Sequence, residues 1–130
     1  MINVSKQLLF SKPCSIDDSG ELRFGAFESS EISNAMVPEH MNVYQKDGGV
    51  EIEFQYPTTL ENEVSFPKSE FVITTGNSDK IVSVYFPEFS REAVAKFVEE
   101  YDLGFWDLKT ANGTWVARVV SNVFELVSLR

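Results

Sequence analysis

The chain is poor in the two residue types that carry most metal and nucleophilic chemistry, with one histidine, His40, and one cysteine, Cys14, among 130 residues. A zinc site needs several His or Cys ligands, so we expect no zinc chemistry. One cysteine cannot form an internal disulfide, and we expect Cys14 to be a structurally inert thiol in a reduced protein. Nothing in the sequence brings His40 close to it, so His40 is interpreted as a surface or loop residue.

Long apolar runs are also missing. No stretch approaches the roughly eighteen apolar residues that a membrane span requires. Near the N-terminus only Leu8, Leu9 and Phe10 form an apolar run, and Lys6 interrupts the candidate apolar region. We therefore expect no secretory signal, no membrane partner and a cytoplasmic location.

The familiar nucleotide-binding and nucleophile motifs are absent from the sequence, which has no Gly-x-x-x-x-Gly-Lys loop, no Gly-x-Gly-x-x-Gly turn and no Gly-x-Ser-x-Gly elbow. The acidic stretch at residues 17–21 lacks the ligand spacing and the distal glutamate of a calcium loop and is interpreted as a turn. We accordingly expect no cofactor, no metal and no enzymatic activity. A small hydrolase that uses a pair of carboxylates remains an alternative.

Positive charge is scarce, because eleven lysines and arginines face twenty aspartates and glutamates, for a formal net charge of −9. Such a chain is repelled by phosphate backbones and by anionic lipids, so direct binding of nucleic acid is not expected. The hydrophobic fraction of 43% is typical of a globular protein. The length fits a single domain over residues 1–130.

Strands are indicated by alternating apolar and polar residues in the middle of the chain. Val50, Ile52 and Phe54 alternate with Glu51 and Glu53, which predicts a strand with both carboxylates on its solvent face. The turn before it predicts a hairpin of residues 41–45 with residues 50–56. Similar signals predict a second hairpin of residues 71–75 with 81–86, and an early hairpin that includes Leu22 and Phe24.

One helix is predicted over residues 90–103, where Val94, Phe97, Val98 and Tyr101 form one apolar stripe behind the N-cap residue Ser90. Residues 115–129 fit either a helix or strands, and their β-branched residues lead us to choose strands. The predicted fold is therefore α+β. It consists of an antiparallel sheet of short hairpin-connected strands, with one principal amphipathic helix at about 90–103 packed on a face.

The excess negative charge is concentrated in one part of the sequence. Residues 17–63 hold eleven acidic and two basic residues, whereas the rest of the chain holds nine of each. If these residues fold as adjacent hairpins, they should form one acidic surface. We therefore predict a partner-binding surface with one aromatic anchor and seven carboxylates, namely Tyr44, Asp17, Asp18, Asp47, Glu51, Glu53, Glu61 and Glu63. Tyr56, Trp106 and Trp115 are further aromatic candidates, although Trp115 lies in a valine-rich segment that favours the core.

In size, acidity, single-domain form and absence of catalytic motifs, the chain resembles bacterial immunity proteins, which neutralise a cognate toxin, often a nuclease. The resemblance is one of general type and assigns no residue a role. It implies a protein that binds and inhibits a basic protein partner by occlusion. Two alternatives remain open, a phage-encoded inhibitor that mimics nucleic acid and a structural or assembly subunit with an extended apolar patch.

Overall fold

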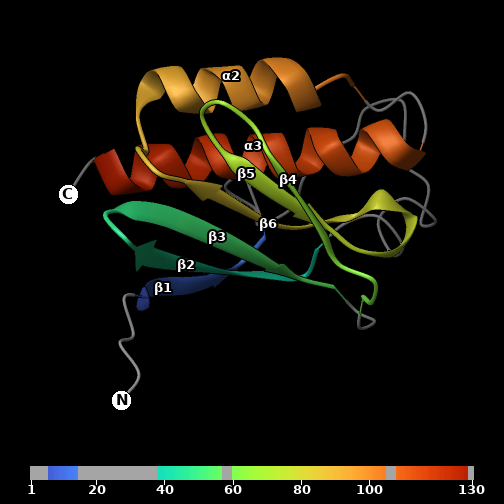
Figure 1. Ribbon diagram of the computed structural model, residues 1–130, viewed down its shortest axis with the longest axis horizontal. Helices are drawn as coiled ribbons and strands as arrows, with labels where there is room; N and C mark the ends of the chain where they lie inside the picture. The colour runs from blue at the N-terminus through green and yellow to red at the C-terminus, as the bar shows by residue number, and fades with distance from the viewer. Residues whose placement is uncertain (1–5, 15–37, 57–59, 105–107, 129–130) are drawn as a thin grey trace.

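The computed structural model describes residues 6–14, 38–56, 60–104 and 108–128. Within them a six-stranded antiparallel sheet lies beneath two helices (Figure 1). The elements are β1 (Lys6–Pro13), β2 (His40–Lys46), β3 (Gly49–Gln55), β4 (Val64–Pro67), β5 (Val72–Thr75), the short 3₁₀ helix η1 (Asn77–Asp79), β6 (Ile81–Phe86), α2 (Arg91–Tyr101) and α3 (Leu108–Ser128). The early hairpin predicted around Leu22 and Phe24 lies outside the described residues.

The strands are arranged in the order β1-β2-β3-β6-β5-β4, with all neighbours antiparallel. Both central hairpins predicted from the sequence, β2–β3 and β5–β6, are present. Pairing of β3 with β6 joins these two hairpins into one sheet. Proline follows β6 at Pro87 and ends β4 at Pro67, in keeping with its inability to donate into a continuing ladder.

Helix α2 confirms the predicted helix and, with the sheet, the predicted α+β fold. It begins after Ser90, whose hydroxyl oxygen accepts a hydrogen bond from the backbone N–H of Ala93 at 3.2 Å. The apolar stripe of the helix faces the sheet. Phe97 packs edge-on against Phe71, with ring centroids 5.2 Å apart, and against Phe86 at 5.9 Å.

The expectation of strands over residues 115–129 is wrong, because this segment belongs to the 21-residue helix α3. Val116, Val119, Val120 and Val123 lie on one side of that helix and are completely buried. The helical cost of a β-branched residue is at most about 0.7 kcal/mol, whereas burying a valine side chain gains about 1.5 kcal/mol or more. Burial against the sheet therefore outweighs local propensity. No helix in the described segments is long and apolar enough to cross a membrane.

The two faces of the sheet differ in character. Ile52 and Phe54 of β3 are buried on the face that carries α2 and α3, whereas Glu51 and Glu53 point to the opposite face. No described helix covers that opposite face (Figure 1). We call it the open face.

A buried polar contact fixes α3 against the sheet. Asn112, 1% exposed, accepts a hydrogen bond from the backbone N–H of Ile81 at 3.0 Å and donates one to the Tyr56 hydroxyl at 2.9 Å. Tyr56 in turn donates to the Ile81 carbonyl at 2.7 Å. Tyr56 is therefore part of the internal packing, and Trp115, 5% exposed, lies in the core as its valine-rich surroundings indicated.

Candidate functional site

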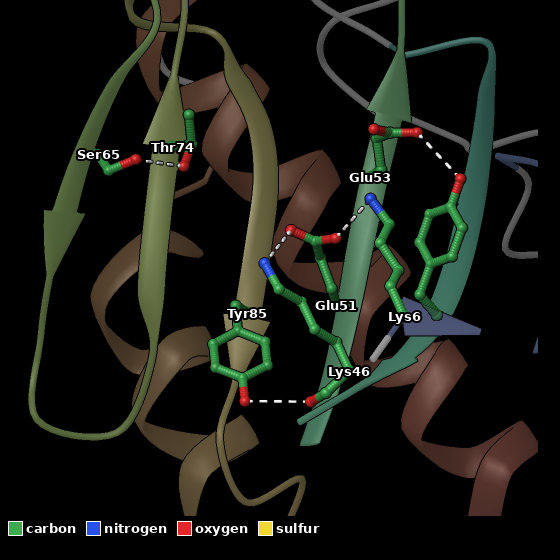
Figure 2. Close-up of polar contacts among 8 residues, drawn as sticks. Lys6, Lys46, Glu51, Glu53, Ser65, Thr74 and Tyr85 are labelled. Atoms are coloured by element: carbon green, nitrogen blue, oxygen red, sulfur yellow. Dashed lines mark hydrogen bonds and ion pairs between the residues drawn. The ribbon is translucent and has the colours of Figure 1, made fainter. Parts of the chain in front are cut away.

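The open face brings together three of the residues predicted to bind a partner. Tyr44 on β2 lies opposite Glu51 on β3. Glu53 follows Glu51 on the same face of β3 (Figure 2). Glu53 accepts hydrogen bonds from the side-chain amide of Asn42 at 3.2 Å and from the Tyr44 hydroxyl at 3.5 Å. These contacts hold the Glu53 carboxylate in place across two strands.

Glu51 is paired with two lysines. Its Oε1 lies 3.0 Å from Nζ of Lys6 and its Oε2 lies 3.7 Å from Nζ of Lys46 (Figure 2). The side chain of Glu51 is only 13% exposed, so the expectation of a solvated carboxylate at this position is wrong. Burial lowers the pKa of Lys6, but the hydrogen bond and charge of Glu51 more than offset it, and the pKa of Lys6 is raised. Glu51 therefore adds little net negative charge to the open face.

The single histidine contacts a serine on the same face. Ser11 Oγ lies 2.5 Å from Nε2 of His40 and donates its only proton to Oδ1 of Asn42 at 2.6 Å. Nε2 of His40 must then be the donor toward Ser11. A serine nucleophile needs the reverse direction, with its proton passing to the imidazole. In this arrangement, Ser11 and His40 therefore do not form an activated pair.

Cys14 lies on the other side of the sheet from His40. Pro13 is opposite His40 in the β1–β2 ladder, and successive side chains of a strand point to opposite faces. The thiol is buried, and this burial raises its pKa to about 12. The geometry thus gives Cys14 neither an imidazole partner nor an accessible thiolate, as expected for an inert thiol.

The remaining predicted carboxylates do not join Tyr44 and Glu53 in one patch. Asp47 lies in the β2–β3 turn, at the end of the sheet where Val50 pairs with Phe86. Glu61 and Glu63 precede Val64, at the opposite end and on the far edge of the sheet, where Val64 pairs with Thr75. Asp17 and Asp18 lie outside the described residues.

A different group of carboxylates surrounds the start of α2. Glu70 of the β4–β5 turn, Glu88 after β6 and Glu92 in the first turn of α2 line a hollow of about 320 Å³. No lysine or arginine lines this hollow, and none of these three glutamates forms an ion pair with a described residue. Glu70, Glu88 and Glu92 were not predicted from the sequence, because they come from the part of the chain with balanced charge.

Asp47 lies at the same end of the molecule. A Cβ atom placed on Gly49 would lie 2.1 Å from the Phe86 carbonyl oxygen and 2.8 Å from that of Pro87. The start of β3, next to the turn that holds Asp47, is thus packed directly against the segment that leads to Glu88. Asp47, Glu70, Glu88 and Glu92 are called the acidic end below. The N-terminus of α2 carries partial positive charge, which helps to stabilise carboxylates that gather there.

The described residues contain no group of three or more His, Cys, Asp or Glu side chains that could hold a metal ion. No protein-family model matches the chain, and neither a curated protein nor a solved structure matches it. We therefore infer a function from the chemistry of the surface.

Proposed function

We propose that the protein binds a basic protein partner through the acidic end and blocks that partner by occlusion. One observation carries the proposal. Four carboxylates from three separate stretches of the chain gather at one end of the molecule, and none has a described lysine or arginine as an ion-pair partner.

Carboxylates at close range repel one another, and the partial positive charge at the N-terminus of α2 offsets that cost only in part, so an external cation would stabilise the group further. A basic protein surface supplies such cations and is attracted over about 10 Å at moderate salt. Complementary charge of this kind raises the association rate more than it raises the lifetime of the complex. Tyr44 and Glu53 on the open face are candidates for the flank of the contact, whereas Glu51 already has Lys6 and Lys46 as partners.

The finer proposal is an immunity-type protein that acts in the cytoplasm against a toxin such as a nuclease. The substrate-binding surface of a nuclease is basic, because it must hold phosphate groups. Carboxylates can occupy the positions of those phosphates and exclude the substrate without any chemical step. The net charge of −9 is consistent with this role.

The test begins with the protein that co-purifies with the tagged chain from its own cells. The association rate of the two purified proteins is measured at ionic strengths from about 0.05 to about 0.5 M. We expect this rate to fall steeply with salt, and one equivalent of the chain to inhibit the partner's activity. A partner without a basic surface, or an association rate that is insensitive to salt, would overturn the proposal.

A further inference from the structure

Strand β4 forms one edge of the sheet and is exposed along its whole length. Val64 and Phe66, which alternate along it, are 51% and 47% exposed and are among the few large apolar side chains that are exposed in the described part of the chain. An exposed edge strand that carries apolar side chains is a ready template for pairing with another strand.

The pairing of β4 with β5 shows which backbone groups of the edge are free. Lys68 donates its N–H to the Phe71 carbonyl at 2.7 Å, so this is a hydrogen-bonded pair. Hydrogen-bonded and non-hydrogen-bonded pairs alternate along an antiparallel ladder, which makes Ser65 and Pro67 non-hydrogen-bonded positions. Their backbone polar groups therefore point outward, away from β5.

Two observations agree with this assignment. Ser65 Oγ and Thr74 Oγ1 are 2.9 Å apart (Figure 2), in keeping with the closer side-chain spacing of a non-hydrogen-bonded pair. Pro67 has no N–H, and such a residue is tolerated where the missing donor would face outward. The N–H and C=O groups of Ser65 are thus available to a further strand.

The other edge of the sheet is better protected against pairing. Strand β1 carries Lys6 and Lys12, and its register is broken by an irregularity between Leu8 and Phe10. Charged residues and bulges of this kind discourage edge-to-edge association. Strand β4 has no charged residue between Val64 and Pro67.

We propose that β4 pairs antiparallel with β4 of a second copy of this chain, about a two-fold axis at Ser65. The two Ser65 residues then exchange backbone hydrogen bonds, and Val64 of each copy lies opposite Phe66 of the other. The two sheets become one continuous sheet. Such an isologous contact is the common geometry of homodimers.

The charges that flank β4 favour a second copy in this orientation. Glu61 and Glu63 precede the strand, and Lys68, whose Nζ also lies 3.1 Å from Oε2 of Glu100, follows it. Antiparallel self-pairing about Ser65 brings Lys68 of one copy to the level of Asn62 of the other, between these two glutamates. The negative end of each strand thus meets the positive end of its partner.

The experiment is sedimentation equilibrium of the full chain at protein concentrations from about 1 µM to about 1 mM, the range suited to a small interface. We expect the mass to rise from that of one chain to that of two. Ser65→Pro, which removes an N–H that is free in the monomer, and Val64→Lys should each abolish the rise. Leu8→Lys is the matched control, because Leu8 is 52% exposed on the opposite edge, and it should leave the rise unchanged.

Circular dichroism and thermal unfolding establish that each variant is folded. A wild-type chain that stays monomeric throughout the range would overturn the inference. So would a dimer that survives both β4 substitutions, or one that Leu8→Lys abolishes. The inference does not depend on the basic partner, since Val64, Ser65 and Phe66 line no part of the acidic end, which reaches β4 only through Glu70 in the turn after it.

Discussion

The ammonium group of Lys6 lies 3.0 Å from Oε1 of Glu51, although the two residues belong to strands that are separated by β2. The contact crosses the open face and, with Lys46, compensates the charge of Glu51. The carboxylate that the sequence indicated for partner binding is thus engaged in holding β1 and β2 to β3. Among the carboxylates that form no ion pair with a described residue, four gather at the acidic end.

We predict that Glu51→Gln lowers the free energy of unfolding by about 1 to 2 kcal/mol, because it leaves two partly exposed lysines side by side without their shared anion. Urea unfolding measures the change. Glu61→Gln is the matched control, since Glu61 is exposed and has no ion pair with a described residue, and its effect should stay within about 0.5 kcal/mol. Equal effects of the two substitutions would show that the lysine contacts do not stabilise the fold.

Alkaline pH should destabilise the fold in part through Cys14. Burial raises the pKa of its thiol from 9.0 to about 12, so the unfolded chain loses this proton at lower pH than the folded chain. The contribution of the protonated thiol to the free energy of unfolding is complete below about pH 9. It declines as the pH rises toward 12, by up to about 1.4 kcal/mol per pH unit. Urea unfolding from pH 8 to 11 should therefore show a shallower decline for Cys14→Ala than for the wild type. Parallel pH profiles would contradict this.

Asn112 provides a test of the contact between α3 and the sheet. Asn112→Ala leaves the buried N–H of Ile81 without its acceptor, which should cost about 1 to 3 kcal/mol. Asn122→Ala, in the same helix at a half-buried position, should cost less. Thermal unfolding compares the two, and an equal loss would mean that the hydrogen bonds of Asn112 contribute nothing specific.

Gly49 allows the β2–β3 hairpin to approach the end of β6. Gly49→Ala would place a Cβ atom 2.1 Å from the Phe86 carbonyl oxygen, so the strands must separate, at a cost of about 1 to 3 kcal/mol or more. Gly48→Asn is the control, because a Cβ at Gly48 meets nothing within 4 Å and its cost comes only from the φ of +83°, a region that asparagine adopts more readily than most residues. The unfolding midpoint in urea should fall further for Gly49→Ala than for Gly48→Asn. A similar fall for both variants would show that the loss of stability comes from the backbone conformation of the β2–β3 turn and not from the close approach to Phe86.

Local sequence patterns correctly predicted the elements in which the apolar positions of the pattern are the ones buried in the fold. The alternation around Ile52 gave β3, and the stripe at Val94 and Phe97 behind Ser90 gave α2. Helix α3 was mispredicted because its valines favour strands locally, and only burial between the sheet and α2 makes them helical. Propensity is a local quantity, whereas that burial depends on the whole fold.

The candidate site was less predictable because it depends on the order of the strands. The sequence pattern predicted that Glu51 and Glu53 share one face of a strand. It did not predict the pairing of β1 with β2, which brings Lys6 to Glu51. Likewise, Glu70 and Glu88 meet only because the β4–β5 turn lies beside the start of α2. Counting charges along the chain did not reveal this proximity.

The role of the acidic end is tested by two double charge reversals of equal size. Glu88→Lys with Glu92→Lys changes the acidic end, and Glu61→Lys with Glu63→Lys changes exposed carboxylates at the opposite end of the sheet. Both are measured at about 1 µM chain, where the self-pairing through β4 is not expected. Thermal unfolding establishes that both proteins are folded, with a loss of about 0.3 to 1 kcal/mol expected for Glu92→Lys at the N-terminus of α2.

The deciding measurement is the association rate of each variant with the co-purified basic partner at low salt. The account predicts a fall of about tenfold or more for the reversal at Glu88 and Glu92, and a much smaller change for the reversal at Glu61 and Glu63. Equal rates for the two variants, or a larger fall for the reversal at Glu61 and Glu63, would contradict it.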